Sequence, residues 1–260
     1  MKILLTNDDG LLAPGLAAIY NVLDDFGQVQ AVAPEDCQSG SGHSLTIGQS
    51  MSCRQVAIDD SLSGWAVGGR PADCVKLAIR ELGDGPLDLV VSGLNNGANV
   101  GINVFYSGTV AAAVEAAFFG IPGVAFSLET EGRENGAELA EDMAKAARVS
   151  GRILRQIIDA GLPKGVVLNV NIPAGAVPKG VRFVRQSTVG IDDSYMRQEG
   201  EQGELAFSMS REFSFSKRID DTDVAAVAEG YVSVTPLHFD LTNYEQLHIL
   251  SDNQWRVTGD

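Results

Sequence analysis

The sequence predicts an α/β protein with a largely parallel sheet flanked by helices. Through the first two-thirds of the chain, short apolar runs alternate with longer segments of helical periodicity, a pattern typical of βαβ units. The 260 residues, 45% of them hydrophobic and 20% charged, suit one globular domain with an additional arm. We therefore expect an α/β core at residues 1–180 and, within the same domain, a hairpin and an oligomerisation arm at residues 181–260.

The periodicity of apolar residues places the core elements. Short apolar runs predict strands at residues 2–6, 28–33, 87–92, 123–127 and 166–171. Apolar residues at helical spacing predict helices at about residues 14–25, 109–119 and 136–159. Gly161-Leu162-Pro163 ends the last of these helices, because glycine and proline are common just beyond a helix end.

The pattern of apolar and polar residues changes after about residue 180. Runs at 181–186 and 206–215 alternate apolar with polar residues, which indicates antiparallel hairpins outside the parallel core. A short helix at 223–229, a strand at 231–235 and a last helix at 244–250 follow. Unpaired hairpins would expose long strand edges in a monomer, so we expect this region to hold the protein in an oligomer.

The net charge restricts the partners of the protein. With 19 basic and 34 acidic residues the chain carries a formal charge of −15, which repels nucleic-acid phosphates and offers no polybasic membrane attachment. We expect neither a nucleic-acid duplex nor a membrane as a partner. An anionic substrate would need local positive charge from a metal, a helix N-terminus or a few arginines.

Three cysteines without a CxxC pair indicate neither a disulfide framework nor a zinc site. The N-terminal residues reach two carboxylates after only a short apolar run, which is too short for a signal peptide. We therefore expect a protein of a reducing compartment, the cytoplasm.

Two adjacent carboxylates, Asp8 and Asp9, follow the first strand. In open α/β sheets, ligands bind beyond the carboxyl ends of the strands. Neighbouring carboxylates without an adjacent Lys or Arg repel each other, and a hard divalent cation relieves that repulsion. Either residue alone is compatible with a turn or a helix cap, but the pair indicates a metal site.

Two glycine-rich loops follow later strands. Residues 39–44, SGSGHS, can bring backbone N–H groups and hydroxyls close to an anion; we expect His43 to be a structural hydrogen-bonding residue rather than a catalyst. Residues 92–101 contain four glycines and three asparagines, and an asparagine carbonyl there is a plausible neutral ligand for a hard metal.

A Ser-Gly-Thr sequence at residues 107–109 directly precedes the alanine-rich helix. Its hydroxyls can cap the helix, or they can join the free N–H groups of the helix start in binding phosphate. Together the four motifs predict a metal-assisted phosphate site, in which the metal polarises a phosphoryl oxygen and lowers the pKa of an attacking water.

Other folds with acidic or glycine-rich motifs after the first strand fit less well. A haloacid-dehalogenase-type phosphatase has a second Asp two positions after the first, where this chain has Gly10. A response-regulator receiver domain would be much shorter, and a dinucleotide-binding enzyme needs a GxGxxG motif that is missing here. The open alternative is a non-catalytic protein that binds metal and phosphate or nucleotide.

The motifs, in their order along the chain, resemble those of the SurE (survival protein E) family of divalent-metal-dependent 5′/3′-nucleotidases. They are MKILLTNDDG, QSGSGHSLT, GGRPADCV, VSGLNNGANVG, YSGTVAAAVEAA and YVSVTPLHFDLT. The resemblance implies a Rossmann-like core, a protruding hairpin and a C-terminal segment exchanged between the subunits of a dimer or tetramer. It also implies hydrolysis of nucleoside monophosphates to nucleoside and phosphate, and in some members of short polyphosphate, with one Mg²⁺ or Mn²⁺ per subunit.

The resemblance also implies site residues. It assigns the metal ligands to Asp8, Asp9, Ser39 and Asn95, of which we expect the two aspartates to be catalytic. We expect substrate or phosphate contacts from Gly40, Ser41, Asn96, Ser107, Gly108 and Thr109. The family usually has Thr at the position of Arg70 and Asp at the position of Asn103; an Arg70 that faces the cleft would add a phosphate contact or alter the preferred base.

Overall fold

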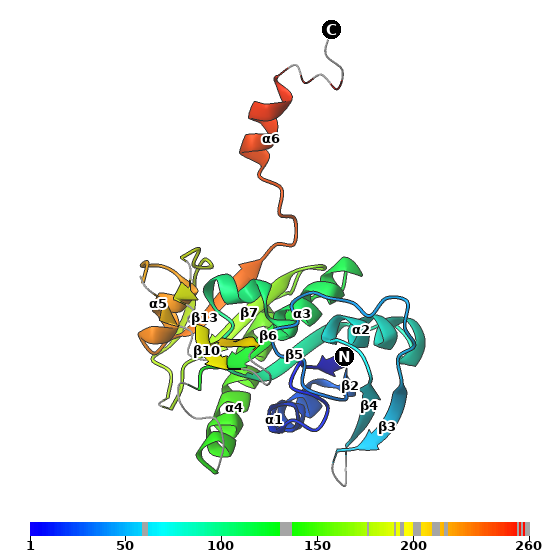
Figure 1. The fold of residues 1–260 in the computed structure, drawn as a ribbon. Coiled ribbons are helices and arrows are strands. Elements are labelled where there is room, and N and C mark those ends of the chain that lie inside the picture. Colours follow the sequence, from blue (N-terminus) through cyan, green and yellow to red (C-terminus); the bar gives the residue numbers. More distant parts are fainter. Residues whose placement is uncertain are drawn as a thin grey trace.

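A nine-stranded mixed sheet forms the centre of the described part of the chain (Figure 1). The computed structural model describes residues 1–58, 62–130, 137–175, 177–189, 191–192, 195–199, 204–209, 214–215, 218–253, 255 and 257. From one edge to the other, the strands are β3 (Cys53–Ala57), β4 (Ser63–Val67), β2 (Gln28–Pro34), β1 (Lys2–Thr6), β5 (Leu89–Asn96), β6 (Gly123–Leu128), β7 (Val167–Ile172), β13 (Val232–Leu237) and β8 (Val181–Phe183).

The strands from β4 to β7 run parallel to one another. At one edge β3 is antiparallel to β4; at the other, β13 is antiparallel to β7 and β8 is parallel to β13. The chain builds outward from β1 through β2 to β4, and then resumes on the other side of β1 with β5, β6 and β7. This is the Rossmann-like order, and the predicted α/β class is confirmed. The direction of winding reverses between β1 and β5, so a ligand crevice is expected at their carboxyl ends.

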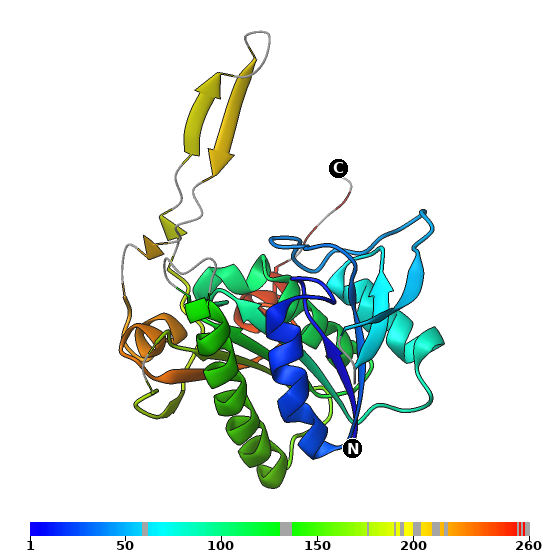
Figure 2. The same ribbon diagram turned by 90° about the horizontal axis from the view of Figure 1, so that it is seen from below.

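Helices cover both faces of the sheet. On one face lie α1 (Pro14–Leu23) and α4 (Ala137–Ala160), side by side in Figure 2; on the other lie α2 (Pro71–Leu77) and α3 (Gly108–Phe118). The alternation of side chains along β1 serves both layers: Ile3 and Leu5 pack with α1 and α4, whereas Leu4 packs with α2 and α3. Short helical turns complete the core at η1 (Asp24–Phe26), η2 (Ala78–Leu82) and η3 (Gly101–Phe105).

The region after residue 180 agrees only in part with the prediction. A hairpin of β10 (Tyr195–Glu199) and β11 (Leu205–Met209) protrudes from the body (Figure 2), and β9 (Ile191–Asp192) pairs with β12 (Ser214–Phe215). The expectation that the run at 181–186 lies outside the core is wrong, because β8 extends the central sheet beside β13. An alternating run is equally typical of an edge strand of a larger sheet, so the pattern alone could not distinguish the two.

Other elements lie close to their predicted positions, but the hairpin strands β9 and β10 and three elements of the core were not predicted. The helix α5 (Asp223–Ala228), the strand β13 and the helix α6 (Tyr244–Ser251) were expected. The strands β3 and β4 and the helix α2 were not; β3 is an exposed edge strand whose sequence, CRQVA, does not alternate apolar with polar residues. The predicted positions 136 and 210–213 lie outside the described residues.

The last segment leaves the body of the molecule. After β13 the chain extends away from the sheet and ends in α6 (Figure 1), none of whose residues is buried. Across the described residues, no helix has the length and apolar character needed to cross a membrane.

Candidate metal and phosphate site

The turn after β1 presents Asp8 and Asp9 at the carboxyl end of the sheet. The side chain of Asn7 forms the turn: its Oδ1 accepts a hydrogen bond from the Gly10 amide at 3.1 Å, and its Nδ2 donates to the Gly10 carbonyl at 2.9 Å. Gly10 has a φ of 104°, which a residue with a Cβ rarely adopts. Asp8 is buried and Asp9 is half-buried.

Among the described residues, no basic side chain forms an ion pair with either carboxylate. Burial raises the pKa of Asp8 from 3.8 to about 6; the charge of Asp9 adds to the shift, and hydrogen bonds from Thr109 oppose it. Burial also raises the pKa of Asp9, against a hydrogen bond from Asn96. A cation bound between them would reverse both shifts, since a positive charge favours the ionised forms.

The start of α3 lies directly against Asp8. The hydroxyl of Thr109 donates a hydrogen bond to the Asp8 carboxylate. A Cβ at Gly108 would lie 2.7 Å from the Cβ of Asp8 and 3.0 Å from its Oδ2, so only glycine permits this approach. Ser107 caps the helix by accepting a hydrogen bond from the Val110 amide at 3.1 Å. Its hydroxyl proton stays free to donate to an anion, whereas that of Thr109 is held by Asp8.

The end of β5 contributes the two asparagines. The register between β5 and β6 shifts between Ser92 and Asn95, so the strand does not end as a regular ladder. The Asn96 amide donates to Asp9 Oδ2 at 3.3 Å. Asn95 donates from Nδ2 to the Gly97 carbonyl at 2.7 Å, which orients its side chain and leaves Oδ1 as a free oxygen ligand.

The loop after β2 is attached to both sides of the site. Its Gln38 amide donates to the Asp8 carbonyl at 2.7 Å, and its Gly42 amide donates to the Tyr106 carbonyl at 3.0 Å. Ser39 is exposed, with its Oγ 3.1 Å from Cys37 Sγ. The Ser41 Oγ is buried and has no hydrogen-bond partner in the described structure. A buried hydroxyl without a partner is rare in proteins and is suited to a ligand oxygen.

Similarity to known proteins agrees with this geometry. A family model described as Survival protein SurE matches residues 3–193. The chain belongs to the SurE family. It is 42% identical to the 5'-nucleotidase SurE of Syntrophobacter fumaroxidans, over 99% of this chain and 100% of the relative, and 41% identical to that of Christiangramia forsetii, over 96% and 95%. The crystal structure of the SurE protein from Aquifex aeolicus superposes with a TM-score of 0.81 at 37% identity, over 97% of this chain and 99% of that one.

Four of the SurE motifs quoted from the sequence meet at this end of the sheet. Hydrogen bonds join the β1 turn to the end of β5, the start of α3 and the loop after β2. No three His, Cys, Asp or Glu side chains cluster as metal ligands among the described residues. A cation here would therefore bind two carboxylates and neutral oxygens, which is the donor set that Mg²⁺ and Mn²⁺ prefer.

Arg70 faces the loop after β2. Its Nη1 donates to Gln38 Oε1 at 3.5 Å, and its amide is held by Asp73 Oδ2 at 2.9 Å. The guanidinium thus lies beside the residue whose backbone contacts Asp8. Asn103, in η3, hydrogen bonds through its backbone to Val100 and Tyr106.

Sequence reasoning missed a set of buried polar residues that hold the glycine-rich loop after β5. The Asn99 amide donates to Asn171 Oδ1 at 2.7 Å, and the Asn99 carbonyl accepts from Asn169 Nδ2 at 2.7 Å. Asp223 Oδ2, on α5, accepts from the Gly101 amide at 2.8 Å. The two asparagines in the otherwise apolar strand 167–172 were a signal that could have identified this network.

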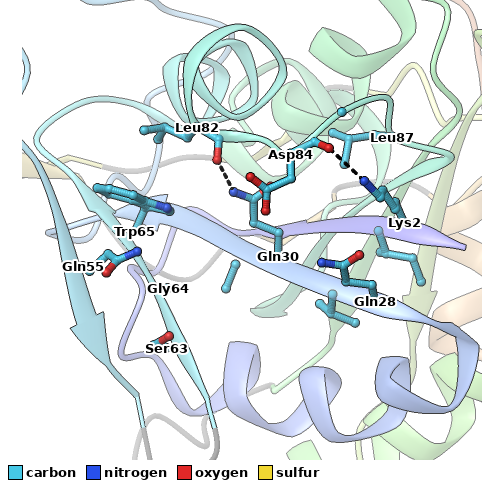
Figure 3. Close-up of a pocket in the computed structure, with 14 residues that line it drawn as sticks. Lys2, Gln28, Gln30, Gln55, Ser63, Gly64, Trp65, Leu82, Asp84 and Leu87 are labelled. Atoms are coloured by element: carbon cyan, nitrogen blue, oxygen red, sulfur yellow. Dashed lines mark hydrogen bonds between the residues drawn. The ribbon is translucent and has the colours of Figure 1, made fainter.

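A cavity of about 300 Å³ lies at the opposite end of the sheet (Figure 3). It is lined by residues at the amino ends of β1, β2 and β4, among them Lys2, Gln30 and Trp65. Gln30 donates to the Leu82 carbonyl at 2.7 Å, and Lys2 donates to the Asp84 carbonyl at 2.9 Å. The cavity contains none of the predicted site residues, and its described lining holds no carboxylate pair.

Proposed function

We propose that this protein is a divalent-metal-dependent nucleotidase that hydrolyses nucleoside monophosphates to nucleoside and phosphate. The observation that carries the proposal is the adjacent, uncompensated pair Asp8 and Asp9, in contact with the start of α3. The relatives named 5'-nucleotidase SurE, aligned over nearly the whole chain, support a phosphomonoesterase of this kind.

The residues at the site fit a divalent cation. Asp8, Asp9, Asn95 and the loop residue Ser39 supply hard oxygen donors, and the raised carboxylate pKa values indicate an unmet demand for positive charge. Mg²⁺ or Mn²⁺ bound there would polarise a phosphoryl oxygen and lower the pKa of a water.

The chain's own groups bind and orient the phosphate. The donors available to a phosphate are the backbone amides at the start of α3, the Ser107 hydroxyl and the buried Ser41 hydroxyl. Asp8 is the one anion that competes with the phosphate for them in the described structure. Gly40 leaves its side of the loop open, since a Cβ there would meet no atom within 4 Å. We propose Gly40, Ser41, Asn96, Ser107, Gly108 and Thr109 as the substrate contacts.

A nucleotide panel tests the proposal. Phosphate release from 5′- and 3′-nucleoside monophosphates and from short polyphosphate is measured with Mg²⁺, with Mn²⁺ and with chelator. We expect metal-dependent release that the chelator abolishes. Calorimetric binding of nucleotide and Mn²⁺ without phosphate release would instead establish the non-catalytic binding protein.

We also propose that the protein is a homo-dimer or homo-tetramer. The C-terminal segment carries exposed apolar side chains: Leu241, Tyr244, Leu247, Ile249, Leu250 and Trp255. The β10–β11 hairpin exposes Tyr195, Met196, Leu205 and Phe207. Exposed apolar segments of this extent are typical of interfaces. The free cysteines Cys37, Cys53 and Cys74 suit the cytoplasm.

A further inference from the structure

Glu115, on α3, is a buried carboxylate that the site described above does not use. It is 1% exposed. Its Oε2 lies 2.7 Å from His43 Nε2, on the loop after β2, and its Oε1 lies 2.6 Å from Lys76 Nζ, on α2. Burial acts to raise the pKa of Glu115, but hydrogen bonds from His43 and Lys76 outweigh it and lower the pKa. The carboxylate is therefore ionised and only accepts, so His43 donates from Nε2.

Stability alone does not explain a carboxylate at this position. The helix around it reads GTVAAAVEAAF, and its other buried residues are small or apolar. A buried ion pair is often no more stabilising than apolar residues of the same volume, because desolvation of the charges offsets their attraction. The ion pair instead fixes the orientation of His43, because Glu115 accepts the hydrogen bond of the imidazole at a single position.

His43 belongs to the loop that carries Ser39, Gly40 and Ser41. Two of the loop glycines, Gly40 and Gly42, have a positive φ, and residues of this kind give the loop little packing of its own. The His43 ring stacks on Phe118, one turn beyond Glu115, with centroids 5.2 Å apart and planes inclined by 11°. Glu115 and Phe118 together fix both the position and the plane of the ring.

The helix that holds His43 is the helix whose start contacts Asp8. Gly108 and Glu115 are seven residues apart on α3, about 10 Å along the axis. A single rigid element thus positions the metal-binding turn at one end and the glycine-rich loop at the other. Besides the His43 contact, the loop is held by the backbone bonds of Gln38 and Gly42, by the Arg70–Gln38 contact and by the bond from the Thr46 amide to Asp73.

We propose that His43 is a positioning residue, which Glu115 holds so that the loop at residues 39–42 is kept in place for metal and phosphate. The proposal rests on the proposed function, since it concerns the same site. It assigns His43 no contact with substrate and no proton transfer.

Four substitutions of the full chain separate positioning from stability. His43→Phe keeps an aromatic ring against Phe118 and removes the donor; His43→Gln keeps an N–H donor. Lys76→Met, the matched control, breaks the other half of the Glu115 pairing without touching the loop. His43→Ala is measured alongside, so that the test still holds if the His43→Phe variant fails to fold.

The readouts are KM and kcat for a nucleoside monophosphate, the calorimetric Kd for Mn²⁺ and for inorganic phosphate, and the melting temperature. We expect His43→Phe and His43→Ala to raise KM and both Kd values about tenfold, as for loss of a hydrogen bond to a charged group. kcat should fall less, and His43→Gln should recover most of the loss. Lys76→Met should lower the melting temperature while KM and Kd stay within about twofold.

Equal KM and Kd values in His43→Phe, His43→Ala and Lys76→Met would overturn the proposal and leave His43 with a purely structural role. A wild-type protein without nucleotidase activity would refute the proposed function instead. The Mn²⁺ and phosphate binding measurements would then still decide the role of His43.

Discussion

The carboxyl end of β1 and the segment after β13 depart in opposite ways from the usual distribution of side chains. At the end of β1, Asp8 and Thr109 are buried, together with the unpartnered Ser41 hydroxyl. After β13, Leu241 is 77% exposed and Trp255 is 73% exposed. Soluble proteins usually bury apolar and expose charged groups, so both regions cost stability in an isolated chain.

The difference indicates what each region lacks. Buried carboxylates with raised pKa values are stabilised by a cation, which is small and hard. Exposed aliphatic and aromatic side chains are stabilised by an apolar surface, such as another protein surface of similar extent. We propose that the first region is a ligand site and the second an interface, and experiments can test each assignment separately.

The largest effect is expected from Asp8→Asn. A neutral amide keeps the shape of the side chain and removes one negative charge from the metal site, so turnover at a fixed Mn²⁺ concentration should fall about a hundredfold or more. Excess Mn²⁺ should restore part of the rate, because metal binding is what was damaged. Asp25→Asn, an exposed acid on η1, is the control and should change little.

A covalent mechanism predicts a different outcome for the same variant. If Asp8 were a nucleophile, no concentration of Mn²⁺ would rescue Asp8→Asn, and rapid quench of the wild type would trap a phosphorylated Asp8. Detection of that aspartyl-phosphate would refute the metal–water mechanism.

Substitution of the arm should change the assembly and not the fold. Leu241→Glu combined with Leu247→Glu places charges on the exposed apolar segment, so the protein should dissociate to single chains of 27.5 kDa. The control is Val177→Glu, since Val177 is even more exposed than these leucines but lies outside the arm. Light scattering reports the mass. A wild type that is already a stable, active single chain would contradict the assignment of this region as an interface.

The pH dependence of the metal-free protein tests the cost of burying Asp8. Because the folded-state pKa, about 6, exceeds the unfolded value of 3.8, the native state holds the Asp8 proton more tightly. Stability should then fall as the pH rises from about 4 to about 6 and level off above that, by about 3 kcal/mol in total. Asp8→Asn removes this cost, so at neutral pH the metal-free variant should unfold at higher urea than the wild type.

Two outcomes decide that experiment. Well below pH 3.8 the metal-free variant and wild type should unfold at similar urea concentrations, since Asp8 is protonated in both the folded and the unfolded state there. A variant less stable than the wild type at neutral pH would show that burial of Asp8 is offset by contacts other than a cation.

The smallest effects are expected at the start of α3. Ser107→Ala should weaken phosphate binding about tenfold and cost about 1 kcal/mol of folding stability through the lost cap. Thr222→Ala is a matched control, because Thr222 caps α5 by the same kind of bond, to the Ala225 amide, away from the site. It should cost similar stability and leave KM unchanged. A fall in melting temperature with unchanged kinetics in Ser107→Ala would assign Ser107 to capping alone.

Much of the fold could be predicted because its signals are local. The apolar run 2–6 and the helical spacing in 137–160 each specify an element within a few residues of the chain. β3 escaped prediction because an exposed edge strand buries no face and therefore shows no periodicity. β8 was assigned to the wrong part of the fold because the sequence of an edge strand alternates in the same way in a hairpin and in a large sheet.

The candidate site could be located in part for the same reason. Asp8 and Asp9 stand out as adjacent acids after an apolar strand, and Ser107 as a cap before a helix. The sequence could not indicate that Thr109 binds Asp8 or that His43 binds Glu115, which lies 72 residues away. Such pairs form between segments that only the folded sheet and its helices bring together.

The sequence by itself determined the α/β class, the order of the motifs and the types of oxygen donor available to a cation. The tertiary structure alone decided which motifs meet, the insertion of β13 antiparallel to β7, and the pKa of Asp8. The physical reason is the distance along the chain over which each effect acts. Backbone propensity and periodicity act within one element, whereas desolvation and ion pairing depend on every segment that packs around a group. The Asp8 carboxyl is acidic in the unfolded chain; its pKa is raised only when the loop after β2 and the start of α3 enclose it.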